Sequence, residues 1–252
     1  MIDTHCHLYS KEFVDDLHDV ISAADTNGVL RFYMPAIDSS TTDAMLKVEE
    51  KYPQVCSMIG LHPCSVNGNY EQELRHVEEW LNKRKFAAVG EIGLDFYWDK
   101  TFIHQQYIAF RKQIAFALDQ QLQIVIHSRN ATGETISVIK EYQGAGLKGI
   151  FHCFGGSLEE AQEIINAGFL LGIGGVVTYK NAGLAEVLKE IDIKHLVLET
   201  DAPYLAPAPF RGKRNESSYL QHIAKKIAEI KNISQEEVAR ITTENALTVF
   251  SY

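Results

Sequence analysis

Residues 87–127 read AAVGEIGLDFYWDKTFIHQQYIAFRKQIAFALDQQLQIVIH, and this stretch contains the unit that repeats along the chain. It opens on a short apolar run, Ala87–Glu91, and closes on a second one, Leu122–His127. Between them, apolar residues in 102–118 recur at the three- and four-residue spacing of one helix face. The stretch therefore predicts a strand, a helix and a second strand, which is the unit of a parallel sheet.

The same alternation extends in both directions, without a linker rich in Pro, Gly or Ser. The predicted strands are Met1–His7, Leu30–Pro35, Val55–Leu61, Ala87–Glu91, Leu122–His127, Gly149–Phe154, Phe169–Gly174 and Leu196–Asp201. A capping-box pattern at 234–237 predicts a last helix that runs towards Leu247. Eight such units in 252 residues favour an α/β fold, a closed (β/α)8 TIM barrel, over an open doubly wound sheet. We expect a single domain over residues 1–252.

Composition excludes several classes of protein. The chain has 24 Lys and Arg against 33 Asp and Glu, so binding to long duplex nucleic acid by charge alone is not expected. Its four cysteines form no CxxC pair, which argues against a disulfide framework or a zinc finger. The first ten residues do not resemble a signal peptide, and no apolar run approaches the roughly 20 residues of a membrane-spanning helix. We expect a cytoplasmic protein with no membrane association and no obligate protein partner.

Polar residues cluster where the predicted strands end. In TIM-barrel enzymes the chemistry lies at the carboxyl ends of the strands. Five of the ten histidines fall at such ends, although these positions are a small part of the chain. The polar residues at or just after strand ends are His5, His7, His62, Glu91, His127, Arg129, His152, Glu199 and Asp201.

The alternation of side chains along a strand predicts which face His5, Cys6 and His7 occupy. His5 and His7 are two positions apart and share one face of a strand, whereas Cys6 points to the other face. By the same rule Cys153, next to His152, is expected to face away from the barrel axis. The two histidines can therefore bind one cation, and Cys6 is expected to be packed under the helices.

Imidazoles and carboxylates together suit a divalent ion such as zinc, manganese or magnesium. The candidate ligands are His5, His7, Glu91, His127, His152 and Asp201. Six ligands exceed the need of one four-coordinate ion, and two ions about 3.5–4 Å apart that share a carboxylate would use all of them. The alternative is a set of buried, hydrogen-bonded residues with no metal.

Several motifs, in order along nearly the whole chain, resemble the TatD family of metal-dependent hydrolases. They are DTHCH at 3–7, GLHP at 60–63, GEIGLD at 90–95, HSR at 127–129, HCFGG at 152–156, ETDAPYLAP at 199–207, RGKRNE at 211–216 and TENA at 243–246. The resemblance implies an amidohydrolase-like TIM barrel with metal-dependent nuclease activity, described for the family as DNase or 3′–5′ exonuclease. One departure is Ser217, where family members often have proline after Asn-Glu.

The resemblance also implies two metal sites that share one carboxylate. One would be formed by His5, His7, Glu91 and Asp201, and the other by Glu91, His127 and His152. Glu91 would bridge the two ions, at a position where many amidohydrolase relatives use a carboxylated lysine. Asp201 would orient or deprotonate the attacking water, and so Asp201 and Glu91 are the catalytic candidates.

Three further residues are candidates for substrate binding. Arg129 follows His127 by two residues, so its guanidinium is expected to bind phosphate from the same side, unless it forms a salt bridge at the rim. Arg211 lies in a short basic cluster, 211–214, that either contacts substrate or is a solvated loop. His62 either contacts phosphate or caps the turn that follows it.

The expected substrate is nucleic acid, as single-stranded DNA or strand ends, bound through the ions and a few basic side chains. Tyr97 and Trp98 either stack on a base or pack a loop. Two alternatives remain open: a metal-dependent amide or ester hydrolase, such as an aminoacyl-tRNA deacylase, and a non-catalytic scaffold whose metal is structural.

Overall fold

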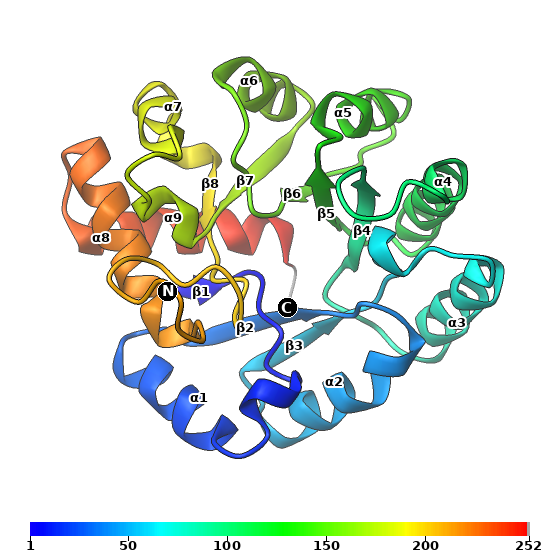
Figure 1. Ribbon diagram of the computed structural model, residues 1–252, viewed down its shortest axis with the longest axis horizontal. Helices are drawn as coiled ribbons and strands as arrows, with labels where there is room; N and C mark the ends of the chain where they lie inside the picture. The colour runs from blue at the N-terminus through cyan, green and yellow to red at the C-terminus, as the bar shows by residue number, and fades with distance from the viewer. Residues whose placement is uncertain (251–252) are drawn as a thin grey trace.

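Parallel strands lie at the centre of the molecule and helices surround them (Figure 1). The computed structural model describes residues 1–250. The strands are β1 (Ile2–Asp3), β2 (Arg31–Pro35), β3 (Val55–Met58), β4 (Val89–Asp95), β5 (Ile124–Arg129), β6 (Gly149–Phe151), β7 (Phe169–Ile173) and β8 (Leu196–Leu198). Each is followed in the chain by helical structure, which is the alternation that the sequence predicts.

The helices form the outer layer. They are α1 (Leu17–Thr26), α2 (Ser39–Lys51), α3 (Tyr70–Lys83), α4 (Ile103–Asp119), α5 (Thr132–Lys140), α6 (Leu158–Asn166), α7 (Leu184–Glu190), α8 (Leu220–Lys231) and α9 (Gln235–Val249). Short 3₁₀ helices lie at Lys11–Phe13, Pro63–Ser65, Gly175–Thr178, Ile193–His195 and Ser217–Tyr219. No helix in the part of the chain described here is long and apolar enough to cross a membrane.

The sheet closes on itself. Two parallel ladders, β1–β2–β3 and β4 through β8, meet at two bridges, Ile59 with Val89 and Cys6 with Ala202. At the second seam the Thr4 N–H donates to the Leu198 carbonyl at 3.0 Å, and the Asp201 N–H donates to the His5 carbonyl at 2.9 Å. The predicted (β/α)8 barrel is therefore confirmed.

The ladder differs from the predicted strands at their carboxyl ends. Most strands stop before their polar residues, so His5, His152 and Asp201 lie just beyond the ladder. β4 instead continues past Glu91 to Asp95, so the strand end predicted at Glu91 is wrong. A register shift between Val89 and Ile92 lets β4 remain paired with β5 as far as Asp95.

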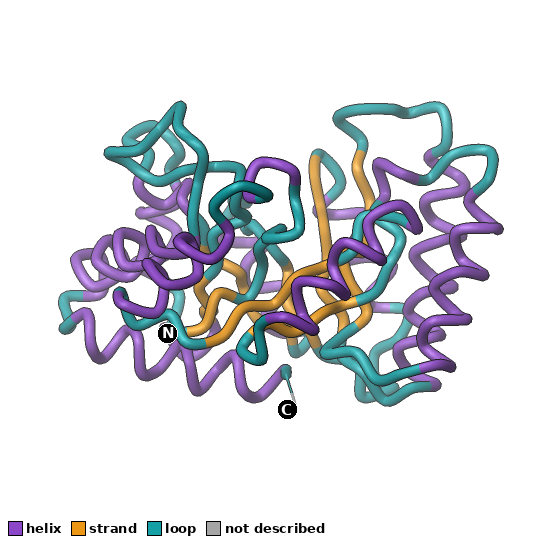
Figure 2. The backbone as a smooth tube through the Cα atoms, turned by 90° about the horizontal axis from the view of Figure 1, so that it is seen from below, coloured by secondary structure: helices purple, strands orange, loops and turns teal. Residues whose placement is uncertain are grey.

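Apolar side chains fill the barrel and close its amino-terminal end. Inward-facing residues of the strands, among them Tyr33, Met58 and Val125, are buried in one cluster with Phe250. The rings of Tyr33 and Phe250 stack with their centroids 3.7 Å apart. The helix α9 lies beneath the strands, and the apolar residues at its end belong to this cluster (Figure 2). The opposite, carboxyl-terminal end is left for the polar residues.

Candidate metal centre

Glu91 lies at the middle of the polar cluster, and its two carboxylate oxygens face different imidazoles. Oε2 is 3.1 Å from Nε2 of His5. Oε1 is 2.9 Å from Nδ1 of His127 and 3.6 Å from Nε2 of His152. Burial raises the pKa of Glu91, but the neighbouring imidazoles outweigh burial and hold it well below its usual value. Glu91 is thus an ionised carboxylate placed between two groups of histidines.

Asp201 approaches the same cluster from the end of β8. Its Oδ1 lies 3.4 Å from Nε2 of His7, and 3.9 Å from Nε2 of both His5 and His152. Its backbone has φ of 56°, a left-handed conformation. The six residues proposed as ligands therefore come together, although they are up to 196 positions apart in the sequence, as His5 and Asp201 are.

The geometry fits metal ions. Three triplets of residues offer ligand atoms that all lie within 4.8 Å of one another: His5, His7 and Glu91; His5, His152 and Asp201; and Glu91, His127 and His152. The ring of His5 is fully buried; its Nε2 lies 3.1 Å from Oε2 of Glu91 without hydrogen-bond geometry, and its Nδ1 has no hydrogen-bond partner within residues 1–250. Burial lowers the pKa of His5, so the ring is neutral and has a lone pair to donate. A buried lone pair that faces two carboxylates is an environment that a cation would satisfy.

Carboxylates outside the cluster orient two of the histidines. Oδ2 of Asp95 lies 2.9 Å from Nε2 of His127, which leaves Nδ1 towards Glu91. Oε1 of Glu199 lies 3.0 Å from Nδ1 of His152, which leaves Nε2 towards the cluster. Burial lowers the pKa of His152, but the charges of Glu199 and Glu91 outweigh it and raise the pKa to about 10. Such outer carboxylates fix the ring orientation of metal-binding histidines.

His7 is oriented by a hydroxyl group. Its Nδ1 lies 2.8 Å from the Tyr9 hydroxyl, which donates to the Pro35 carbonyl at 2.6 Å. The Tyr9 oxygen is therefore an acceptor for the His7 ring, and Nε2 of His7 is left towards Asp201.

Sequence reasoning did not assign roles to Asp95, Glu199 or Tyr9. A signal exists for Glu199, because it lies two residues before Asp201 and shares its face. A signal for Asp95 exists only if β4 is extended beyond Glu91, since Glu91 and Asp95 then face the same way. Tyr9 carries no spacing signal, because it lies beyond the strand.

His62 caps the turn that follows it, which is one of the two roles considered for it. Its Nδ1 accepts a hydrogen bond from the Cys64 N–H at 3.0 Å and so caps the 3₁₀ helix at Pro63–Ser65. Its Nε2 points into the cluster, 3.3 Å from Nδ1 of His127 and 3.5 Å from Oε1 of Glu91.

The prediction that Cys153 faces away from the barrel axis is wrong. Its sulfur lies within 4.8 Å of a ligand atom of both His152 and Glu199, and its N–H donates to Oε1 of Glu199 at 2.7 Å. The alternation rule fails because β6 ends at Phe151 and Cys153 has φ of 49°. Cys6, in contrast, is buried against the Tyr33 carbonyl, as its alternation predicts.

Arg129 lies at the rim next to an aromatic pair. Its guanidinium carbon is 3.9 Å from the ring centroid of Tyr97 and 5.2 Å from that of Trp98. No carboxylate forms an ion pair with Arg129 in residues 1–250, so the rim salt bridge is not formed there. The side chain is exposed, and its N–H groups are available to an anion.

The basic segment 211–214 is divided between two roles. Arg211 is exposed and lies over the ring of Tyr179 at 4.2 Å. Arg214 is paired with Asp16 at 2.6 Å and with Glu216 at 2.9 Å, so its charge is compensated within the protein. Only Arg211 and Lys213 of this segment remain as free cations in the described chain.

The loop after β8 is held by Asn215. This buried side chain donates to the Thr200 carbonyl at 2.7 Å and to the Tyr204 carbonyl at 2.6 Å. Ser217, which stands where family members often have proline, is also buried and begins the 3₁₀ helix at Ser217–Tyr219.

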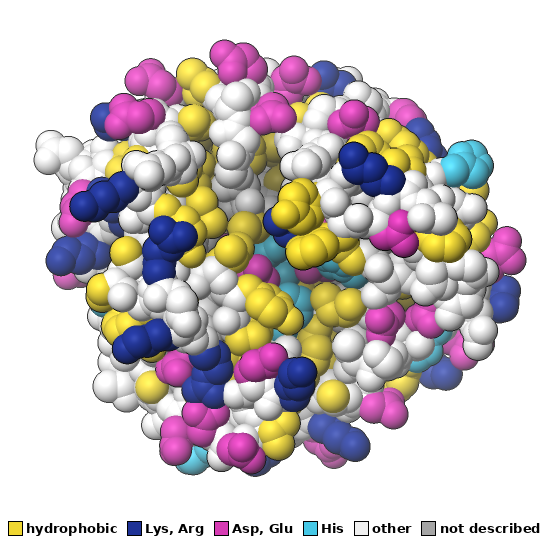
Figure 3. Space-filling view, in the orientation of Figure 1, with side chains coloured by type: hydrophobic (Ala, Val, Ile, Leu, Met, Phe, Trp, Pro, Cys, Tyr) yellow, Lys and Arg dark blue, Asp and Glu magenta, His cyan; other side chains and the backbone are white. Residues whose placement is uncertain are grey.

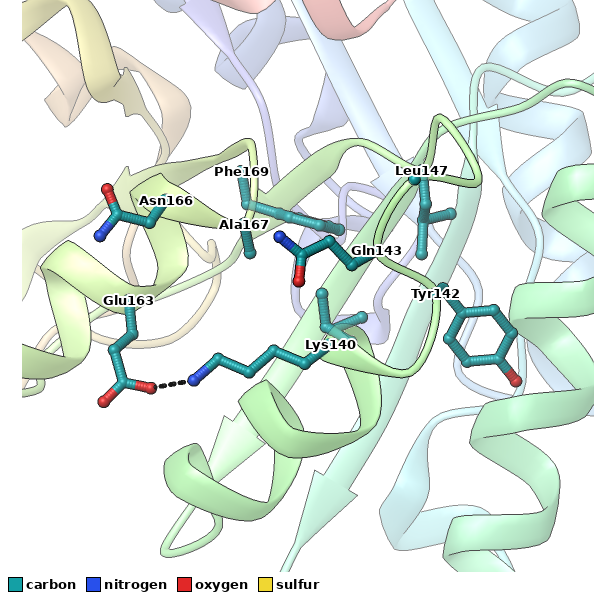
Figure 4. Close-up of a pocket in the computed structure, with 10 residues that line it drawn as sticks. Lys140, Tyr142, Gln143, Leu147, Glu163, Asn166, Ala167 and Phe169 are labelled. Atoms are coloured by element: carbon teal, nitrogen blue, oxygen red, sulfur yellow. Dashed lines mark hydrogen bonds and ion pairs between the residues drawn. The ribbon is translucent and has the colours of Figure 1, made fainter.

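One pocket lies on the outer surface of the barrel, and another lies beside the polar cluster. One, of about 240 Å³, lies on the outer surface between α5 and α6, where Lys140 and Glu163 form an ion pair of 2.6 Å (Figure 4). None of the candidate ligands lines it. The other, of about 510 Å³, lies beside the cluster and is lined by Arg129, His152 and the backbone of Gly155. Figure 3 shows the histidines at the floor of a central hollow bordered by hydrophobic side chains.

Known proteins resemble this chain over its whole length. A sequence profile described as TatD related DNase matches residues 2–251. The metal-dependent hydrolase YabD of Bacillus subtilis is 42% identical over 251 residues, which are 99% of this chain and 98% of that protein. A protein of Pectobacterium parmentieri named 3′-5′ ssDNA/RNA exonuclease TatD is 31% identical, with 99% of both chains covered. The crystal structure of YjjV, a TatD homologue from Escherichia coli, superposes with a TM-score of 0.95 at 28% identity, covering 100% of this chain and 98% of that one. The chain therefore belongs to the TatD family of metal-dependent hydrolases.

Proposed function

We propose that this hydrolase cleaves phosphodiester bonds in nucleic acid, with two divalent ions, and that it acts on single-stranded DNA or strand ends from the 3′ side. The observation that carries the proposal is the position of Glu91, whose two oxygens face separate groups of imidazoles. A bridging carboxylate between two ions is a feature of two-metal hydrolytic sites. The relative named as an ssDNA/RNA exonuclease supports the choice of substrate.

The residues would divide between two ions as the resemblance implies. His5, His7, Glu91 and Asp201 would hold one ion, and Glu91, His127 and His152 the other. Magnesium, manganese and zinc all accept such ligands. When bound, the ions would neutralise the phosphate oxygens and lower the pKa of a water molecule from 15.7 towards neutrality.

Asp201 is the best placed carboxylate to take the proton from the attacking water. Its side chain is 14% exposed, whereas that of Glu91 is 3% exposed and that of Glu199 is fully buried. Burial raises the pKa of Asp201, but the hydrogen bond with His7 and the charges of His152 and His7 outweigh burial and lower it. Asp201 is thus ionised at neutral pH and can accept a proton at an oxygen that solvent reaches.

Positive charge for the substrate would come from side chains at the rim. Arg129 has no carboxylate partner in the described residues and lies two positions after His127. We assign it to a phosphate oxygen, with Arg211 and Nε2 of His62 as further contacts. An unpaired guanidinium beside the centre favours phosphate over the acyl group of an amide or ester substrate.

The test is a comparison of substrates on one preparation. Protein loaded with Mg²⁺, Mn²⁺ or Zn²⁺ is incubated with a 5′-labelled single-stranded DNA oligomer, with the same sequence as duplex, and with an aminoacyl-tRNA. We expect a ladder that shortens from the 3′ end, fastest on the single strand and abolished by Asp201→Asn. Release of the amino acid from aminoacyl-tRNA, with the DNA intact, would replace this proposal with the acyl hydrolase.

A further inference from the structure

We infer that Tyr97, Trp98 and Arg129 form a platform on which one unpaired nucleobase of the substrate stacks beside the metal centre. This inference rests on the proposed function, because it names the part of the substrate that the rim recognises. The three residues are called the platform below. The alternative, considered from the sequence, is that the two aromatic residues only pack a loop.

Exposure argues against loop packing. Trp98 is 66% exposed and Tyr97 is 49% exposed, so about two thirds of Trp98 and about half of Tyr97 are open to solvent. The two rings meet edge to face, with centroids 4.9 Å apart. Large aromatic surfaces are usually buried, because their transfer out of water is favourable. Two adjacent exposed rings beside Arg129, which lines the pocket of about 510 Å³, are instead typical of a binding surface.

The platform is fixed to a metal ligand through one carboxylate. Oδ1 of Asp95 accepts hydrogen bonds from the N–H groups of Tyr97 and Trp98, at 2.9 and 3.0 Å. Oδ2 of the same carboxylate lies 2.9 Å from Nε2 of His127. The Phe96 N–H also donates to the Arg129 carbonyl at 2.9 Å. The backbone of the platform is therefore held rigidly with respect to the centre, while its rings remain open to solvent.

The chemistry of the platform selects an unpaired base. Aromatic rings bind the π-face of any base, and base stacking on aromatic side chains is largely independent of sequence. Bases inside a duplex already stack on their neighbours, so only a splayed or terminal base has a free face. The guanidinium carbon of Arg129 lies over the ring of Tyr97, 3.9 Å from its centroid, and its N–H groups have no acidic partner in residues 1–250, so they can bind a phosphate oxygen of the same nucleotide. The pocket of about 510 Å³ next to Arg129 and His152 gives room for the nucleotide.

The test compares two oligomers that differ only in their bases. One is a thymidine oligomer, and the other has the same length and phosphates but carries abasic residues. We expect the ratio of kcat/KM between the thymidine and abasic oligomers to fall roughly 5- to 100-fold in Trp98→Ala, mainly through KM, from the usual contribution of one stacked base. Trp98→Phe should retain most of the ratio, because it keeps an aromatic face. Trp80→Phe changes the other of the chain's two tryptophans, on α3, and should leave the ratio and the activity unchanged.

A binding measurement separates this inference from the proposed function. In Trp80→Phe the remaining tryptophan is Trp98, and its fluorescence should be quenched by the thymidine oligomer and much less by the abasic one. Quenching without any cleavage by the metal-loaded protein would support the platform and overturn the nuclease proposal. Cleavage with an unchanged ratio in Trp98→Ala, or with equal quenching by both oligomers, would overturn the platform and leave the nuclease proposal standing.

Discussion

At the scale of single residues, Glu91 connects the parts of the site. It is almost completely buried, and no lysine or arginine forms an ion pair with it in residues 1–250. A buried carboxylate without a permanent cation is costly, and the five neighbouring histidines can compensate it only through partial protonation or through bound ions. The burial of Glu91 costs folding stability, and we attribute it to the proposed binding of metal ions.

Replacement of Glu91 by alanine should remove metal and activity together. Without the shared carboxylate, neither group of histidines has a complete ligand set, so we expect activity to fall by more than about a hundredfold, beyond the effect typical of outer ligands. Metal per protein, measured by elemental analysis after dialysis, should fall in parallel. Glu186→Ala, at an exposed position of α7, is the matched control. Full activity in Glu91→Ala would exclude Glu91 as a bridge.

Replacement of Arg129 by alanine should affect the substrate and not the metal. A charge-assisted hydrogen bond to phosphate contributes about 1.5–3 kcal/mol, so we expect KM for a DNA oligomer to rise roughly 10- to 100-fold. Metal content should be unchanged, because no ion pair joins the Arg129 side chain to a candidate ligand in residues 1–250. Loss of metal in this variant would show that Arg129 supports the centre instead.

At the scale of elements, β4 carries two carboxylates of the site, Glu91 and Asp95. Glu91 and Asp95 lie on one face of it and contact the two ring nitrogens of His127, at 2.9 Å each. The strand predicted from the sequence, Ala87–Glu91, stops at its first charged residue. For that reason the sequence predicts Glu91 and misses Asp95. The same limit explains Cys153, since a left-handed residue after β6 leaves no pattern in the sequence.

Gly93→Ala should destabilise the pairing of β4 with β5. Gly93 has φ of +143°, and a Cβ there would lie 2.0 Å from the His127 carbonyl oxygen. A clash with backbone can be relieved only by moving a strand, so we expect a loss of more than about 2 kcal/mol in the free energy of unfolding. Urea unfolding followed by circular dichroism measures it. Gly133→Ala is the control: its Cβ meets nothing within 4 Å, and it should be neutral or stabilise by about 0.4–1 kcal/mol. Equal stability of Gly93→Ala and the parent would contradict the close packing of these strands.

At the scale of the whole molecule, the sequence predicts the barrel but not how its amino-terminal end is closed. Hydrophobic periodicity is local, so each strand and helix can be predicted from its own segment of the sequence. The eight apolar runs with helical spacing between them then favour a closed barrel. The stacking of Phe250 on Tyr33 joins residues 217 positions apart and has no local signal. The candidate ligands could be expected to lie together for a related reason: the fold places all strand ends together, whatever their separation in sequence.

Removal of metal should lower the stability of the entire barrel. The candidate ligands come from β1, β4, β5, β6 and β8 or the residues that follow them, so bound ions would connect strands across both seams of the sheet. An ion at a hundredfold excess over its Kd stabilises the folded state by about 2.7 kcal/mol. For a chain of this size we expect the Tm to rise by roughly 5–10 °C from the EDTA-treated to the metal-loaded protein. Identical melting curves with and without EDTA would argue against tight binding of ions at this centre.

The net charge of −9 limits how the protein can bind DNA. Near the carboxyl-terminal end of the barrel, Arg129, Arg211 and Lys213 are exposed and lack an acidic partner in the part of the chain described. Each neutralised phosphate of a single strand contributes about −0.7 to the slope of log K against log salt concentration, so the slope for a thymidine oligomer should lie between about −0.7 and −2. Titrations in KCl at fixed metal concentration measure this slope.

Arg129→Ala should reduce the slope by about 0.7. Arg240→Ala, whose parent residue pairs with Glu244 on α9, should not change the slope. A slope steeper than about −4 would mean that a larger basic surface, away from the centre, binds the strand.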